Sequence, residues 1–188
     1  MTPEAQQTFN VLFVCTGNLC RSATAEAFAR REMQRHQGAP LRFISAGTHA
    51  VEGSPAASRS AIAAAERGAP MERHHARELT RRRVRAAHLI LPMAAEHRPF
   101  VLALDRSAAR RTFLVASFAR AVSQWSWLAD SPAELVTMAA EHLRELPGDD
   151  IDDPLGHPPA AYTACAERLD GLVSTVVDAL IKSTSTVA

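Results

Sequence analysis

The sequence predicts an α/β fold, a single doubly wound domain with a four-stranded parallel sheet flanked by helices. The first observation is the run at 10–14 (NVLFV), aliphatic and aromatic after its first residue, which is typical of a strand covered on both faces. The second is the alternation of strand-like and helix-like segments after it, which favours a parallel sheet. The third is a length of 188 residues without a repeat or a composition break, which indicates one domain over 1–188.

The first half of the chain reads as strand, helix, strand, helix, strand. The expected elements are a strand at 10–14, a helix at 22–36, a strand at 41–45, a helix at 58–67 and a strand at 88–91. The first helix is amphipathic, because Ala25, Phe28 and Ala29 share one side and arginines take the other. Gly68 ends the second helix. Ligands of such folds bind beyond the carboxyl ends of the strands, so that edge is where we expect the site.

The second half completes the predicted sheet and its helical cover. We expect a fourth strand at 111–115 (RTFLV), helices at 118–122 and 133–146, and a last helix at 160–181. Pro147 and Gly148 end the helix predicted at 133–146. The apolar side of the last helix faces the sheet and comprises Tyr162, Cys165, Leu169, Leu172, Val176 and Leu180. Residues 1–9 and 183–188 are expected to be flexible ends.

Composition excludes several classes of protein. The formal net charge is +1, and the arginine-rich run at 73–85 contains Glu78, has Glu72 beside it and holds no interleaved aromatic residues, so we expect no nucleic-acid partner. Three cysteines, an odd number, indicate a reducing compartment. The N-terminus lacks the basic start of a signal peptide, and no apolar run is long enough to span a bilayer. The sequence therefore predicts a cytoplasmic protein with no membrane partner, and it leaves the oligomeric state open.

The segment between the first strand and the first helix carries the predicted chemistry. Cys15 ends the strand, Arg21 follows six positions later, and Gly17 and Asn18 tolerate a positive φ between them. Such a loop turns backbone N–H groups inward and forms an anion site at the positive end of a helix. The residues expected to bind the anion are Thr16, Gly17, Asn18, Leu19, Cys20, Arg21 and Ser22. The Arg21 guanidinium supplies a planar fork for two phosphate oxygens.

The same loop predicts a cysteine nucleophile. The helix N-terminus and Arg21 favour the thiolate form of Cys15. Ser22 is placed to hydrogen-bond the sulfur, to cap the helix, or to do both. Asn18 is expected to bridge the loop internally. Cys20 either forms a reversible disulfide with Cys15 or is a small buried apolar residue.

A thiolate that attacks phosphorus needs a proton donor for the departing oxygen. The loop before the last helix offers Asp149, Asp150, Asp152 and Asp153. We choose Asp153, because Pro154 fixes the following backbone and Gly156 permits a sharp turn, and we expect the other acids to be solvated turn and cap residues. His157 is the second choice as proton carrier.

These motifs together resemble those of the low-molecular-weight protein tyrosine phosphatases. The resemblance spans most of the chain and rests on residues 14–22 (VCTGNLCRS), the Asp153–Pro154 pair, 45–48 (SAGT), 74–79 (HHAREL) and Met93. It implies Cys15 as the nucleophile, Arg21 as the phosphate clamp and Asp153 as the general acid and then base. It also implies that Asn18, Ser22 and His74 form the hydrogen-bond network that supports the loop.

The chain departs from the family's pattern around the substrate. Leu155 and Gly156 stand where members often carry aromatic residues, and His49, Ala50 and Val51 stand where a tryptophan is common. The segment at 121–148, with Trp125 and Trp127, is longer than in the minimal family domain. These changes affect the walls around the substrate rather than the reaction.

The resemblance implies a phosphomonoester hydrolase that acts on protein phosphotyrosine through a cysteinyl-phosphate intermediate. The expected ligands are a phosphotyrosyl protein or a small aryl phosphate, and inorganic phosphate or vanadate; no metal and no cofactor are expected. One alternative is an arsenate reductase of the same fold, although the additional cysteines that such enzymes use near the third strand are missing. The other is a non-catalytic phosphoprotein-binding module.

Overall fold

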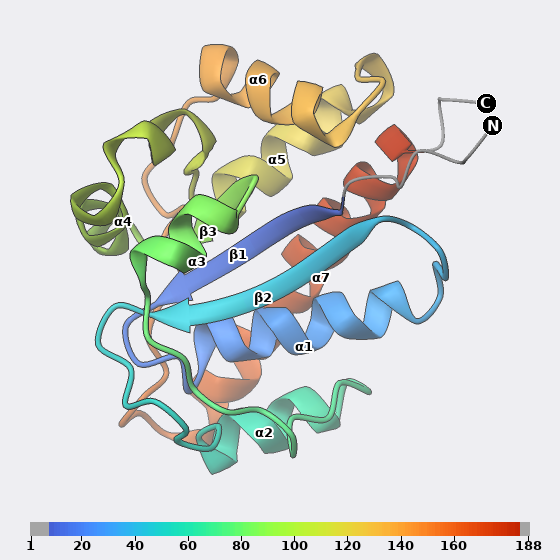
Figure 1. Cartoon of the computed structure of the whole chain (residues 1–188). Helices are drawn as coiled ribbons and strands as arrows, with labels where there is room; N and C mark the ends of the chain where they lie inside the picture. Colours follow the sequence, from blue (N-terminus) through green and yellow to red (C-terminus); the bar gives the residue numbers. More distant parts are fainter. Residues whose placement is uncertain (1–7, 185–188) are drawn as a thin grey trace, which may run out of the picture.

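The computed structural model describes residues 8–184, which form an α/β structure around a small parallel sheet (Figure 1). The strands are β1 (Phe9–Cys15), β2 (Leu41–Gly47) and β3 (Leu89–Pro92), in the order β2-β1-β3. Both pairings are parallel, with Phe13 opposite Ser45 on one side and Leu91 on the other. β1 is therefore the central strand, as its apolar sequence predicts.

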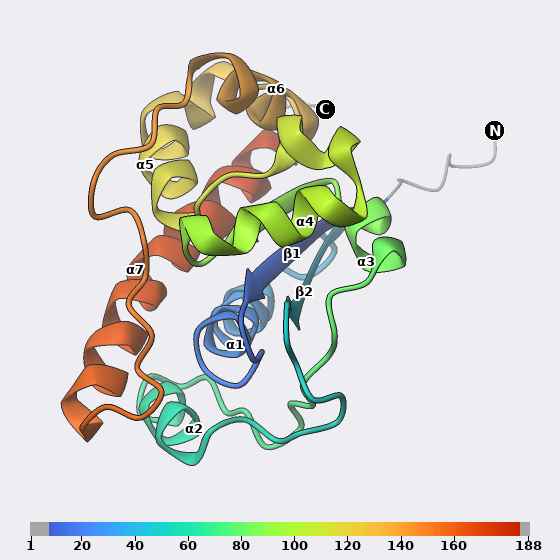
Figure 2. The ribbon, with the colours of Figure 1, turned by 90° about the vertical axis from the view of Figure 1, so that its left-hand side faces the viewer.

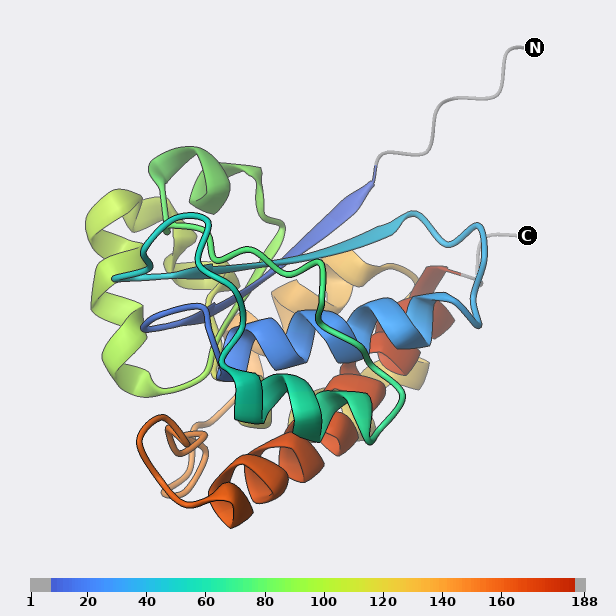
Figure 3. The ribbon, with the colours of Figure 1, turned by 90° about the horizontal axis from the view of Figure 1, so that it is seen from below.

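Helices cover both faces of the sheet, as a doubly wound fold requires. The α-helices are α1 (Arg21–Met33), α2 (Ser58–Ala65), α3 (Arg81–Ala86), α4 (Arg98–Leu104), α5 (Val115–Trp125), α6 (Pro132–His142) and α7 (Pro159–Thr184). Short 3-10 helices lie at Ala95–His97, Arg106–Arg111 and Ser126–Leu128. In the view from below, α1, α2 and α7 lie over one face of the sheet (Figure 3).

Alternation along β1 divides the core into two parts. Val11 and Phe13 belong to the larger cluster, which also holds buried residues of α1, α5 and α7. Leu12 and Val14 belong to the smaller cluster, with Val84 of α3 among its members. Side chains of successive strand residues point to opposite faces, so one apolar strand anchors both layers of helices.

The predicted fourth strand is wrong. Within residues 8–184 the sheet has three strands, and the segment at 111–115 contributes an isolated bridge between Thr112 and Ile90. Leu114 already caps α5, which begins at Val115, so the chain leaves the sheet edge at once. The segment is apolar because its side chains are buried in the core rather than because it forms a strand: Phe113 and Val115 lie in the larger core cluster.

Other predicted boundaries shift where tertiary contacts decide them. The first helix ends at Met33 instead of residue 36, and the helix predicted at 118–122 spans Val115–Trp125. The helix predicted to run to 146 ends at His142, ahead of Pro147, where the backbone of Leu143 becomes extended. The 73–85 run contains α3, which Thr80 caps by accepting from the Arg83 N–H. α4 was not predicted either.

The predicted flexible ends fall partly on described residues. Of the residues predicted to be flexible ends, 1–7 and 185–188 lie outside the described residues, whereas Phe9 belongs to β1 and the buried Ser183 to α7. None of the described helices combines the length and the hydropathy that a bilayer-spanning segment needs.

Candidate active site

The Cys15–Ser22 loop lies at the carboxyl ends of the strands, which face the viewer in Figure 2. Cys15 is the last residue of β1 and Arg21 the first of α1, so the loop joins the central strand to a helix N-terminus. The Cys15 thiol is buried, and its Sγ lies 2.9 Å from the Ser22 hydroxyl. This location and contact are those expected from the sequence. The helix-capping role predicted for Ser22 is wrong, because the N-cap residue of α1 is Cys20 and Ser22 lies inside the helix.

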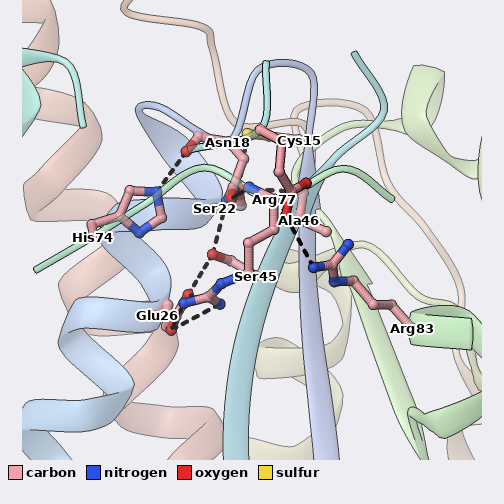
Figure 4. A network of polar contacts seen from close by, with 10 residues as sticks. Cys15, Asn18, Ser22, Glu26, Ser45, Ala46, His74, Arg77 and Arg83 are labelled. Atoms are coloured by element: carbon pink, nitrogen blue, oxygen red, sulfur yellow. Dashed lines mark hydrogen bonds and ion pairs between the residues drawn. The ribbon is translucent and has the colours of Figure 1, made fainter. Parts of the chain in front are cut away.

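Asn18 is the centre of the hydrogen-bond network inside the loop (Figure 4). Its φ of 54° is left-handed, and its side chain is fully buried. The side-chain amide donates to the hydroxyls of Ser22, at 2.9 Å, and Ser45, at 2.8 Å, while its oxygen accepts from the Arg77 N–H at 2.8 Å. The backbone oxygen of Asn18 accepts from His74 Nε2 at 2.7 Å. The side-chain amide, its oxygen and the backbone carbonyl of Asn18 therefore all have hydrogen-bond partners.

A second set of contacts, centred on the Glu26 carboxylate of α1, supports this network. Ser45 donates to the Glu26 carboxylate, and Arg77 pairs with the same carboxylate at 3.2 Å. Burial lowers the pKa of His74, while its hydrogen bond to Asn18 acts in the opposite direction. The neutral imidazole has one N–H, and the Asn18 carbonyl requires it on Nε2.

β2 ends directly against the loop. A Cβ on Gly47 would lie 2.5 Å from the Thr16 carbonyl oxygen, closer than any side chain allows. The next residues continue the contact, because Thr48 and His49 donate their N–H groups to the carbonyls of Cys15 and Thr16. The position therefore requires glycine for a close backbone approach.

Arg21 joins the loop to a segment far along the chain. Its Nη2 lies 2.6 Å from Asp153 Oδ2, and its Nη1 donates to the Ile151 carbonyl at 3.2 Å. The guanidinium is buried, and its Nε is the one buried side-chain nitrogen or oxygen without a partner among residues 8–184. An unpartnered buried donor is costly, so Arg21 is built to bind an additional acceptor.

The structure brings Asp153 to the site and leaves Asp150 and Asp152 exposed as predicted, but Asp149 differs from the prediction. The Asp153 side chain is 40% exposed and accepts from the Leu155 N–H. Asp149, predicted to be solvated, is buried and binds Ser117 and Arg120 of α5. The prediction failed because both partners lie about 30 residues earlier. His157 is exposed.

His97 is a site residue that the sequence analysis missed. Its buried ring lies 3.1 Å from the Thr16 hydroxyl through Nε2, and its Nδ1 meets the backbone of Ala94. Burial and the nearby Arg21 lower its pKa. No local sequence motif identifies His97 as a site residue. The one signal that could have done so is its position shortly after the carboxyl end of β3.

The other thiols do not share the surroundings of Cys15. Cys15, Cys20 and Cys165 are free in the structure. Burial raises the pKa of Cys20 to about 11 and that of Cys165 to about 12. Cys20 therefore has the environment of a small apolar residue, the second of the two expected readings.

Exposed apolar side chains lie on segments that contact the site residues through Thr48, His49 and Asp153. Val51 is 74% exposed, Leu155 is 52% exposed and Phe100 is 43% exposed. Phe100 of α4 meets the ring of His49 edge to face, at 4.9 Å between centroids. An aromatic residue of α4 thus packs on His49, whose N–H donates to the Thr16 carbonyl, although the expected family positions lack an aromatic residue.

Comparison with known proteins assigns this arrangement to a family. The model of the family described as low molecular weight phosphotyrosine protein phosphatase matches residues 10–146, more than half of the chain. The chain belongs to this family. The low-molecular-weight phosphatases are cysteine-dependent enzymes, and the matched range contains the Cys15–Ser22 loop and His74.

The phosphatase relatives fall into two named activities. The low molecular weight protein-tyrosine-phosphatase Etp of Escherichia coli K12 is 38% identical over 111 residues, which cover 58% of this chain and 72% of Etp. The protein-arginine-phosphatase of Geobacillus stearothermophilus is 26% identical over 172 residues, 92% of this chain and 96% of its own. The solved tyrosine phosphatase of T. tengcongensis superposes with a TM-score of 0.71 at 29% identity, covering 91% of this chain and 99% of that one.

Proposed function

We propose that this phosphatase hydrolyses phosphotyrosine on proteins, with Cys15 as nucleophile, Arg21 as phosphate clamp and Asp153 as general acid and base. The observation that carries the proposal is the buried Arg21 guanidinium, which joins the cysteine loop to Asp153 and keeps Nε without a partner. A phosphate oxygen is the acceptor that this nitrogen requires, and a second oxygen on Nη2 gives the bidentate geometry that arginine favours.

The first step transfers the phosphoryl group to sulfur. The Cys15 thiolate attacks phosphorus and forms the P–S bond while the bond to the phenolic oxygen breaks. The proton of the Asp153 carboxyl moves to that oxygen, so tyrosine leaves as a neutral phenol. Arg21 and the backbone N–H groups of residues 16–21 hold the phosphoryl oxygens as charge spreads over them.

The second step returns the enzyme to its starting state. The Asp153 carboxylate takes a proton from water, whose oxygen attacks phosphorus as the P–S bond breaks. The sulfur leaves as a thiolate, to which the Ser22 hydroxyl 2.9 Å away donates a hydrogen bond. Inorganic phosphate is then released.

The substrate class rests on the walls of the site. Exposed apolar groups on the flanking segments, including Phe100 and Leu155, suit the ring of a tyrosine. Phosphoarginine is a second candidate, because the protein-arginine-phosphatase aligns over 92% of this chain. Its leaving group is polar and gains less from these apolar surfaces.

A comparison of substrates tests the proposal. We expect kcat/KM for a phosphotyrosyl peptide to exceed that for the matched phosphoarginyl and phosphoseryl peptides at least tenfold, with vanadate inhibition and full activity in chelator. A preference for phosphoarginine contradicts the substrate class but leaves the chemistry in place. Phosphopeptide binding without turnover supports a binding module, and arsenate-dependent oxidation of thiols supports an arsenate reductase.

A further inference from the structure

Asp149 is a buried carboxylate that the proposed reaction does not use. It begins the segment 149–157, here called the acid loop, which carries Asp153 and leads into α7. The residue is 5% exposed, unlike the exposed Asp150, Asp152 and Asp153 around it. A buried charge is retained only where it has partners, so its contacts show what the residue does.

The contacts of Asp149 come from α5 and from the chain that follows α6. Ser117 donates to one carboxylate oxygen at 2.7 Å, and Arg120 binds both oxygens, at 2.5 and 3.0 Å. The Leu146 N–H donates to the same carboxylate at 2.6 Å. Arg120 also donates to the Arg144 carbonyl, so the end of the 121–148 segment and the start of the acid loop are tied to one face of α5.

The acid loop then runs directly from this anchor to the catalytic centre. Ile151 donates to the Met93 carbonyl at 2.7 Å and accepts from Arg21 at 3.2 Å. Asp153 lies two residues further on and reaches Arg21 at 2.6 Å. Asp153 lies four positions after Asp149, a span of at most about 14 Å, so a shift at the first limits where the second can reach.

Beyond Ile151 the acid loop is held mainly near its end, where the Gly156 N–H donates to the Tyr162 hydroxyl at 3.2 Å and Arg59 donates to the His157 carbonyl at 2.9 Å. Residues 152 and 153 and residues 155–157 are exposed, and Asp153 itself bonds only to Arg21 and the Leu155 N–H among the described contacts. The position of the Asp153 carboxyl therefore depends on the supported stretches on either side of it, and the buried first part of the loop is one of them. Asp149 supplies the buried carboxylate of that part, beside Arg168, which donates to the carbonyls of Gly148 and Asp150.

We propose that Asp149 is a positioning residue that, through Ser117 and Arg120, holds the acid loop so that Asp153 can transfer its proton. The proposal rests on the proposed function and extends it, because it couples α5 and the long segment after it to a single chemical step. Loss of Asp149 should then impair proton transfer to the leaving group while phosphate binding in the Cys15–Ser22 loop is retained.

The test compares Asp149→Asn with the milder Ser117→Ala, using Glu145→Gln as a control. Glu145 lies in the same segment, and its carboxylate pairs with Arg98 on the surface, so this variant removes one charge without touching Asp149. The rates to measure are kcat/KM values for aryl phosphates whose phenols range from good to poor leaving groups. The inhibition constant of inorganic phosphate is measured alongside.

We expect Asp149→Asn to lose about tenfold or more on poor leaving groups and less than about threefold on good ones, with phosphate binding unchanged within twofold. Ser117→Ala follows the same pattern more weakly, and Glu145→Gln behaves as wild type. Asp149→Asn adds no further loss in an Asp153→Asn background, because it acts through that residue. Equal loss on all leaving groups, or additive loss with Asp153→Asn, overturns the proposal.

Amide hydrogen exchange separates this inference from the proposed function. Exchange at 150–156 should be faster in Asp149→Asn than in wild type, with residues 16–22 unchanged. If wild type hydrolyses no phosphomonoester, the proposed function fails, and exchange alone decides the placement of the loop. Unchanged exchange at 150–156 overturns the inference even in an active enzyme.

Discussion

The Cys15–Ser22 loop and the acid loop meet at Arg21, but they are held in different ways. The first is short in sequence and closed on itself, with Asn18 and Ser22 fully buried and bonded to each other. The second comes from more than 130 residues later and carries Asp153, whose side chain is 40% exposed. The residues that line the cysteine loop thus come from one contiguous motif, which Ser45, His74 and Arg77 support, whereas the proposed general acid is brought in by a distant segment.

This difference predicts how each loop responds to change. Damage inside the cysteine loop should affect every substrate and also the stability of the fold, because its polar groups are buried and have no water to replace a lost partner. Damage to the acid loop should affect mainly the proton-transfer step. The following experiments test that contrast.

The largest effect should follow loss of the nucleophile. In Cys15→Ser we expect turnover to fall by about 10⁴-fold or more, because a serine hydroxyl is a far weaker nucleophile than a thiolate. Tungstate or vanadate binding should persist, since Arg21 and the backbone N–H groups remain. Steady-state rates and calorimetric titration measure the two quantities. Comparable losses of binding and turnover are inconsistent with a separate role for the sulfur.

Loss of the general acid should give a smaller and more selective effect. Asp153→Asn should slow hydrolysis of aryl phosphates with poor leaving groups by about 10²- to 10⁴-fold, and the loss should shrink as the phenol becomes more acidic. Asp152→Asn is a matched control on the same exposed loop. A loss that is the same for every leaving group rejects Asp153 as the acid.

The cysteine loop can also be broken at its centre. Asn18→Ala removes hydrogen bonds to Ser22, Ser45 and the Arg77 N–H and places alanine at a φ of 54°, so we expect about 3 kcal/mol of destabilisation. Asn18→Gly loses the same bonds without the backbone strain and should recover about 1 kcal/mol. Denaturant unfolding measures both. Equal stabilities for the two variants contradict a strained backbone at this residue.

The smallest effect concerns pH and the anchor of the acid loop. Its hydrogen bonds to Arg120 and Ser117 hold the pKa of Asp149 well below the ordinary value, so this carboxylate stabilises the fold above the unfolded-state pKa of about 4. That stabilisation is lost as pH falls through the lower folded-state value. Asp149→Asn should therefore be about 2 kcal/mol less stable than wild type at pH 7, with the gap narrowing below pH 4. If the difference in stability between wild type and Asp149→Asn does not change with pH, the charge of Asp149 is not what stabilises the fold.

What the sequence could predict follows the same division between local and distant contacts. The strands β1, β2 and β3 and the placement of Cys15 and Arg21 follow from contiguous apolar runs and from one loop motif. The prediction of a strand at 111–115 was wrong because a run of buried apolar residues can lead into a helix as well as form a strand. Asp149 and His97 could not be recognised, since Arg120 and Thr16, their partners, lie far from them in the sequence.

Gly47 has a consequence for protein engineering. Gly47 ends β2, and a methyl group on its Cα would strike the carbonyl of Thr16 in the loop that carries Cys15 after β1. Transplanting the eight-residue motif into another parallel sheet would therefore not suffice. The recipient must also offer a bare backbone at the tip of the adjacent strand, or the grafted sulfur and guanidinium will be pushed out of register.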